Sequence, residues 1–104
     1  MKLFLLLAAL VGGAGFSQNT AHPGNSYRYD LTFQGEARAT IDLKGDGKSI
    51  LECFLYDEKA SLIVSDVGAG DTFHFTLVPK AKTTFIFVVK NTGNNYDKYT
   101  LIAD

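Results

Sequence analysis

The side chains that could bind a metal ion are acidic residues in two predicted loops. Asp66 and Asp71 flank a segment that contains two glycines, and Asp97 lies in a later loop. If the loops meet at one end of the fold, their oxygens could hold Ca²⁺, which prefers carboxylate and carbonyl ligands. Loops also select Asp for hydrogen bonds to their own backbone. We therefore expect no metal and no other cofactor, and we keep the three carboxylates as weak calcium candidates.

An earlier acidic stretch imitates only the start of an EF-hand loop. Asp42 and Asp46 have the spacing of its first and fifth positions. Lys44, however, stands where an oxygen ligand is needed, and the twelfth position is Cys53 rather than Glu. The pattern does not predict an EF-hand.

Side chains suited to catalysis do not form a motif. His22 lies in a segment that we expect to be flexible, and His74 is expected to face solvent on a strand. No serine is placed beside a base by any motif. Asp57 and Glu58 are neighbouring carboxylates, but adjacent positions in a turn point apart. The sequence therefore predicts a protein that is not an enzyme.

Cys53 is the single cysteine, so the chain cannot form an internal disulfide. It lies between Leu51 and Leu55 on the expected inward face of a strand. This position favours a buried small hydrophobe, with intermolecular pairing as the alternative. The stability of the fold must then come from packing.

The elements that would position these residues are short strands. Apolar and polar side chains alternate with a period of two, which is typical of half-buried strands, and turn residues separate the segments. No helical period follows the leader. The expected strands lie at residues 27–33, 37–43, 50–56, 62–64, 72–77, 84–89 and 99–101. About seven strands at this spacing predict an antiparallel two-sheet β-sandwich.

Matching parity on successive strands predicts five core residues, which lie on four of the strands: Leu51, Leu55, Phe75, Phe87 and Leu101.

Two of these strands also carry apolar side chains on the opposite face. The opposite side of residues 50–56 and 84–89 carries Ile50, Phe54, Tyr56, Ile86 and Val88. A two-layer sandwich usually exposes polar groups there. If the two strands are neighbours, the five side chains form a partner-binding patch. The alternative is that these residue types occur there because they favour strands, and that Lys90, Lys98 or a loop covers them.

The N-terminus has the pattern of a secretory signal peptide. Lys2 precedes an apolar run at residues 3–11, which is too short to span a bilayer, and small residues follow. We predict cleavage before Gln18, with cleavage after Gly15 as the alternative. No cysteine directly follows the leader, so no lipid anchor is expected.

Length and charge limit the rest of the chain to one small domain. We expect a signal peptide over residues 1–17, a flexible segment over 18–26 and a β-sandwich over 27–104. Ten Lys and Arg and eleven Asp and Glu give a formal net charge of −1, with the basic residues scattered singly. The sequence therefore predicts no nucleic-acid binding and, after cleavage, no membrane insertion. The expected destination is the periplasm, the cell surface or the medium.

A Gly-Asp-Gly turn at residues 45–47 precedes the strand Leu-Glu-Cys-Phe-Leu-Tyr-Asp at 51–57. This pattern resembles the bacterial pre-peptidase C-terminal (PPC) domain, where a similar turn precedes Leu-Asp-Leu-Tyr-Val-Tyr-Asp. Further segments agree in order: residues 62–66, Pro79, 85–89, Asn91, Gly93 and 96–99. The resemblance covers about residues 29–102. It implies a jelly-roll-like β-sandwich of secreted bacterial proteins, usually attached to peptidases and used for localisation or substrate binding.

The chain also departs from the PPC pattern. Lys48 and Ile50 stand where many members carry acidic residues, and no cysteine pair flanks the loop at 66–71. We therefore predict a secreted, non-catalytic module that binds a protein partner or an extracellular polymer, with homo-oligomerisation left open. The alternatives are an accessory or inhibitor chain that acts on a secreted peptidase, and a calcium-stabilised structural protein of the envelope.

Overall fold

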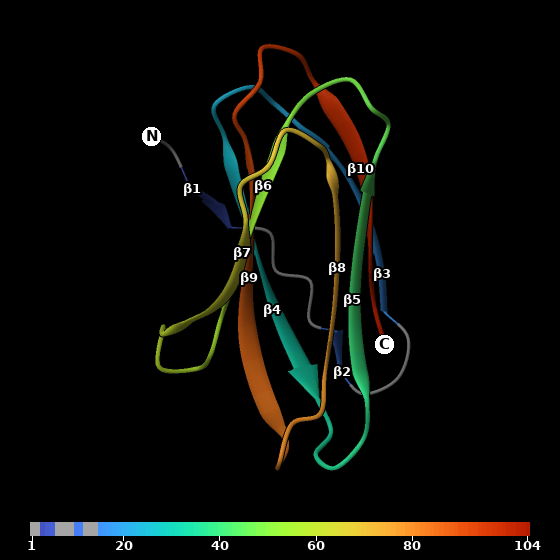
Figure 1. Ribbon diagram of the computed structural model, residues 1–104, viewed down its shortest axis with the longest axis vertical. Helices are drawn as coiled ribbons and strands as arrows, with labels where there is room; N and C mark the ends of the chain where they lie inside the picture. The colour runs from blue at the N-terminus through green and yellow to red at the C-terminus, as the bar shows by residue number, and fades with distance from the viewer. Residues whose placement is uncertain (1–2, 6–9, 12–14) are drawn as a thin grey trace.

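The computed structural model describes residues 3–5, 10–11 and 15–104, which form ten strands (Figure 1). The strands are β1 (Leu3–Leu5), β2 (Leu10–Val11), β3 (Gly15–Ala21), β4 (Ser26–Phe33), β5 (Ala39–Gly45), β6 (Leu51–Tyr56), β7 (Leu62–Asp66), β8 (Thr72–Leu77), β9 (Thr83–Asn91) and β10 (Asp97–Ala103). Among the described residues, no helix is long and apolar enough to cross a membrane. The predicted signal peptide lies partly outside the described residues and stays a prediction.

Strands β3 to β10 form two antiparallel sheets of four strands each. Sheet A has the order β4-β9-β6-β7, and sheet B has the order β3-β10-β5-β8. β1 and β2 add short parallel pairings to the outer edge of β4. The two sheets face each other around one core, which confirms the predicted β-sandwich. The eight strands of the two sheets exceed the expected seven by β3.

β3 corrects the expectation for residues 18–21 of the segment 18–26, which we expected to be flexible. Gly15–Ala21 runs antiparallel to β10, from the pair Gly15 and Ala103 to the pair Ala21 and Asp97. Its sequence, Gly-Phe-Ser-Gln-Asn-Thr-Ala, has no regular apolar alternation. The hydrogen-bond ladder with β10 therefore stabilises this strand more than its own side chains do, and the pattern of the sequence could not indicate it.

The core contains the inward side chains of both sheets. Leu51, Leu55, Phe87 and Leu101 are all buried, as parity predicted. Phe75 is only partly buried, because β8 is an edge strand of sheet B; it packs against the core beside the buried Phe73. The inward direction of Phe75 was thus right, but its full burial was not.

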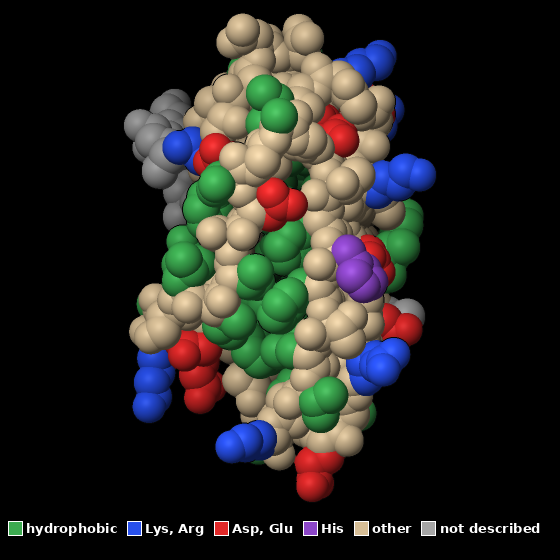
Figure 2. All heavy atoms as spheres, in the orientation of Figure 1, with side chains coloured by type: hydrophobic (Ala, Val, Ile, Leu, Met, Phe, Trp, Pro, Cys, Tyr) green, Lys and Arg blue, Asp and Glu red, His purple; other side chains and the backbone are tan. Residues whose placement is uncertain are grey.

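The side of the sandwich between β7 and β8 is partly open. These strands are the last in their sheets and do not pair with each other. Three hydrophobic side chains, Val64, Phe75 and Leu77, are partly buried against the core there. Figure 2 shows hydrophobic side chains in the middle of this face. Sequence parity cannot show this opening, because it does not identify the edge strands.

Candidate functional site

The apolar side chains on the outer face of sheet A lie side by side. β6 and β9 are neighbours, so that Phe54 lies opposite Val88 and Tyr56 lies opposite Ile86. Opposite residues of an antiparallel pair share a face and have their Cβ atoms about 5 Å apart. All four side chains are half-buried. The structure therefore brings together four of the five predicted residues.

Ile50 does not join these four residues. It precedes β6, and its carbonyl accepts a 3.0 Å hydrogen bond from the Thr92 N–H in the loop after β9. The pair of Glu52 and Lys90 lies between Ile50 and the four residues along the strands. The five-residue patch is thus interrupted by a charged pair.

Leu62 of β7, rather than Ile50, is the fifth apolar residue beside these four. A bulge between Leu55 and Tyr56 shifts the pairing of β7, so that Leu62 lies opposite Tyr56 and Val64 opposite Leu55. Without the bulge, alternation from the inward Val64 would turn Leu62 inward as well, whereas 55% of Leu62 is exposed. We call the set Phe54, Tyr56, Leu62, Ile86 and Val88 the outer patch.

A charged pair borders the outer patch on β4. Arg28 lies opposite Val88, and Asp30 lies opposite Ile86. The Arg28 Nε donates to the Asp30 Oδ1 at 3.1 Å, and about a third of each side chain is exposed. An apolar centre with a polar rim is the usual anatomy of a protein interface.

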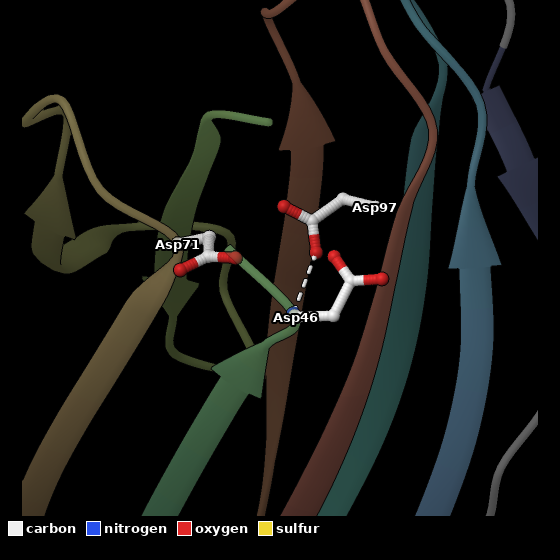
Figure 3. A group of neighbouring side chains, drawn as sticks. All are labelled: Asp46, Asp71 and Asp97. Carbon is white, nitrogen blue, oxygen red and sulfur yellow. Dashed lines mark hydrogen bonds between the residues drawn. The ribbon is translucent and has the colours of Figure 1, made fainter. Parts of the chain in front are cut away.

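The acidic side chains meet at one end of the sandwich, but not in the predicted combination. Carboxylate oxygens of Asp46, Asp71 and Asp97 lie within 4.8 Å of one another (Figure 3). Asp66 is not part of this group; it is exposed and accepts a 3.1 Å hydrogen bond from the Gly68 N–H. The structure thus joins two of the three calcium candidates and adds Asp46. The Gly-Asp-Gly turn is the sequence signal that could have indicated Asp46.

Backbone donors of that turn hold the buried carboxylates. Asp71 Oδ2 accepts from the Gly47 N–H at 2.7 Å. Asp97 accepts from the Asp46 N–H at 3.2 Å and from the Ser49 N–H at 3.1 Å. These bonds explain the fold of the loop without any ion, in agreement with the backbone role that Asp has in many loops.

Gly45 is the residue that lets the two carboxylates approach the turn. A Cβ at this position would overlap with Asp71 Oδ2 and would lie 2.5 Å from Asp97 Oδ1. Gly47 serves a different purpose, since its φ of +82° is in the left-handed region that favours glycine. The two glycines of the motif are therefore required for separate reasons, close approach and backbone conformation.

Asp97 holds a proton more tightly than a free carboxylate does. Burial, together with the hydrogen bond and negative charge of Asp71, raises the pKa of Asp97 to about 6, although the backbone N–H of Asp46 opposes this shift. Two adjacent buried carboxylates favour sharing a proton when no cation is bound. A proton or a cation could therefore reduce the negative charge of the cluster, and the two cases predict different responses to pH and calcium.

His74 has a partner that the sequence did not indicate. Its Nδ1 contacts Asp42 Oδ1 across β5 and β8, and its Nε2 lies 3.5 Å from Thr76 Oγ1. This order of groups resembles that of a hydrolytic triad, but the side chains of His74 and Asp42 are 67% and 48% exposed. A triad depends on a positioned, water-excluding site with oxyanion donors. An exposed pair on the outer face of a sheet does not supply one.

The thiol of Cys53 lies in the core, as its position predicted. Only 1% of the residue is exposed. Burial, followed by the charges of Asp66 and Glu52, raises the pKa of the thiol to about 12. Because the thiolate is the reactive form, this cysteine is chemically inert while the protein is folded.

The likeness to known proteins lies in the fold. No protein-family profile and no curated protein sequence matches the chain. Its structure is similar to the crystal structure of the pre-peptidase C-terminal domain of collagenase from Bacillus anthracis, with a TM-score of 0.70, 12% identity and coverage of 100% of this chain and 98% of that one.

A second similar structure is PliG from Aeromonas hydrophila, a periplasmic lysozyme inhibitor of g-type lysozyme. The TM-score is 0.61 and the identity 13%, with 97% of this chain and 98% of that chain covered. Identities this low establish the fold alone. The two-sheet sandwich and the first of these similarities together show that the chain has the fold of a PPC domain.

Proposed function

We propose that this protein is an exported, non-catalytic β-sandwich module that binds a protein partner through the outer patch. The observation that carries the proposal is the pairing of Phe54 with Val88 and of Tyr56 with Ile86 on the outer face of sheet A. Apolar groups clustered on a face that is usually polar support a recognition surface. The charged rim of Arg28 and Asp30 would favour one orientation of the partner.

Two substitutions test the outer patch, with a matched control on the other sheet. Phe54→Ser and Ile86→Thr each remove an apolar anchor, which we expect to weaken binding by about 1 to 3 kcal/mol. Ile102→Thr makes the same change as Ile86→Thr on the outer face of sheet B, where Ile102 is 41% exposed. The control should leave binding unchanged.

The measurement combines capture and melting. The processed protein is used to capture partners from culture fluid or periplasm, and the affinity for the recovered partner is then measured for each variant. If Phe54→Ser and Ile86→Thr lose as much stability as a core truncation while affinity is unchanged, the outer patch is structural and the proposal fails. A polymer instead of a protein as the captured ligand would place the chain among polymer-binding modules.

A second candidate function is inhibition of a secreted hydrolase. It is supported by the similarity to the periplasmic lysozyme inhibitor PliG, and it agrees with the accessory or inhibitor role towards peptidases that the sequence suggested. The direct test is to add the processed protein to g-type lysozyme and to a secreted peptidase and to measure the rate of each. An unchanged rate at micromolar concentrations of the protein would argue against inhibition of these enzymes.

The calcium-stabilised alternative rests on the acidic cluster of Asp46, Asp71 and Asp97. In that case calcium would stabilise the end of the sandwich where the loops meet. Melting temperatures of the parent and of Asp97→Asn, measured with and without calcium, separate calcium binding from proton binding.

A further inference from the structure

The predicted signal peptide, residues 1–17, contains β1, β2 and the first three residues of β3. β1 and β2 lie within residues 1–17, and both pair in parallel with β4: Leu3–Leu5 with residues 26–28, and Leu10–Val11 with residues 31–32. When the leader is removed, β4 becomes the outermost strand of sheet A. The inference below therefore rests on the export proposed above.

The edge of β4 is suited to pairing with another strand. β4 has eight residues, contains no proline and pairs with β9 without interruption from Ser26 to Phe33. The opposite edge strand, β7, has five residues and a bulge next to it. Long regular edges without bulges or prolines are templates for strand addition. β1 and β2 pair in parallel with residues 26–28 and 31–32, so short stretches of this edge accept hydrogen bonds from a further strand.

We propose that the processed protein forms a symmetric dimer through antiparallel pairing of β4 with β4 of a second copy. In such a pair, opposite residues lie on the same face, so the inward Tyr29 must meet an inward residue. A two-fold axis at Arg28 would place Arg28 opposite Arg28 of the second copy. An axis at Asp30 would place two Asp30 side chains opposite each other.

An axis at Tyr29 gives the complementary arrangement. Arg28 of each copy then lies opposite Asp30 of the other copy, which makes two opposite-charge pairs. Opposite charges directly across an antiparallel pair are favourable, and like charges are unfavourable. Side-chain parity and charge thus select one register among the neighbouring ones, and the interface is self-complementary, as a two-fold dimer requires.

The dimer would contain one continuous sheet with the order β7-β6-β9-β4-β4-β9-β6-β7. Both outer patches would lie on the same face of this sheet, on either side of the Arg28 and Asp30 pairs. Arg28 and Asp30 belong to both surfaces, whereas the apolar residues of the outer patch lie on β6, β7 and β9, away from the edge. Variants of these apolar residues therefore separate partner binding from dimerisation.

Charge reversal tests the register. The exported protein is purified, its N-terminus is sequenced, and its mass is measured by light scattering or sedimentation; we expect twice the mass of one processed chain. Each of the variants Arg28→Asp and Asp30→Arg turns both opposite-charge pairs of the dimer into like-charge pairs. Each should raise the dissociation constant of the dimer at least about tenfold. A mixture of the two variants should recover the dimeric mass. One chain then has aspartate at both positions and the other has arginine at both, so each cross-strand pair joins opposite charges.

Further variants serve as controls. Lys82→Asp reverses an exposed charge in the loop before β9 and should leave the dimer intact. Phe54→Ser changes the outer patch and should also keep the dimeric mass. The double variant Arg28→Asp with Asp30→Arg should dimerise again. Melting curves of the single variants establish that they are folded.

Several results would overturn the proposal. A monomeric processed protein would show that the edge stays open or takes another strand, such as one from a partner. A dimer that persists in folded Arg28→Asp, or that is lost in Phe54→Ser, would show that another surface makes the contact. An exported protein that retains residues 1–17 would refute the removal of the leader rather than the dimer contact, and N-terminal sequencing identifies this case separately.

Discussion

The hydroxyl oxygens of Tyr29 and Tyr99 lie 2.5 Å apart in the middle of the sandwich, one from each sheet. Both residues are almost fully buried, and Asn19 Nδ2 of β3 donates to the Tyr99 hydroxyl at 3.3 Å. Burial and the Tyr29 hydroxyl raise the pKa of Tyr99 well above its usual range, so the Tyr99 hydroxyl stays protonated. This contact joins sheet A to sheet B and ties β3 to the core.

Replacing Tyr99 by Phe should destabilise the fold by about 1 to 3 kcal/mol, because it leaves the buried Tyr29 hydroxyl without its partner. The measurement is the free energy of unfolding from denaturant melts. The double variant Tyr29→Phe with Tyr99→Phe should lose less than the sum of the two single variants, since it removes both hydroxyls. Additive losses would show that the two groups do not interact.

Truncating Phe87 to Ala should cost about 3 to 5 kcal/mol, because Phe87 is fully buried and the cavity cannot collapse completely. A small domain without disulfides has little stability to lose, so much of the variant should be unfolded. Leu62→Ala is the control, since Leu62 is 55% exposed. Equal unfolding curves for Phe87→Ala and the parent would contradict the observed strand register.

Gly45→Ala should destabilise the protein by about 1 to 3 kcal/mol, because the new methyl group would collide with the carboxylates of Asp71 and Asp97. Gly70→Ala is the matched control: nothing lies within 4 Å of its added Cβ. It should be neutral or slightly stabilising, because it only reduces the freedom of the unfolded chain. Similar losses in both variants would argue against the close approach at Gly45.

The acidic cluster should make the protein more stable as the pH falls from about 7.5 to about 5. The pKa of Asp97 is about 6 in the folded protein against 3.8 for an ordinary Asp, so the folded state binds the proton more tightly. This contribution is complete below pH 3.8 and is lost as the pH rises through about 6. It is measured as the melting temperature at a series of pH values. Asp97→Asn should flatten the dependence.

Calcium distinguishes a bound cation from a bound proton in the acidic cluster. We expect neither EDTA nor millimolar CaCl₂ to change the melting temperature at a pH of about 7.5, because backbone N–H groups of the turn already hold the carboxylates of Asp71 and Asp97. A saturable rise with calcium that Asp97→Asn abolishes would instead establish the calcium-stabilised alternative. The same variant thus serves both experiments.

The strands that alternate clearly were predictable, because side-chain direction is a local property of an extended backbone. Leu51, Leu55 and Phe87 point inward as their parity requires. The Gly-Asp-Gly turn was visible for the same local reason, since Gly47 has the positive φ that such a turn needs. Even the apolar character of Phe54 and Ile86 on the second face followed from the sequence.

By itself, the sequence determined which side chains share a face of each strand, because alternation depends only on neighbouring residues. Only the tertiary structure decided which strands are neighbours and which lie at the edges. β3 forms because β10 pairs with it, and Leu62 joins the outer patch through a bulge. Asp46 meets Asp71 and Asp97 because the end of β5 lies beside the starts of β8 and β10. These relationships depend on hydrogen bonds and packing between residues far apart in the chain, which local alternation does not encode.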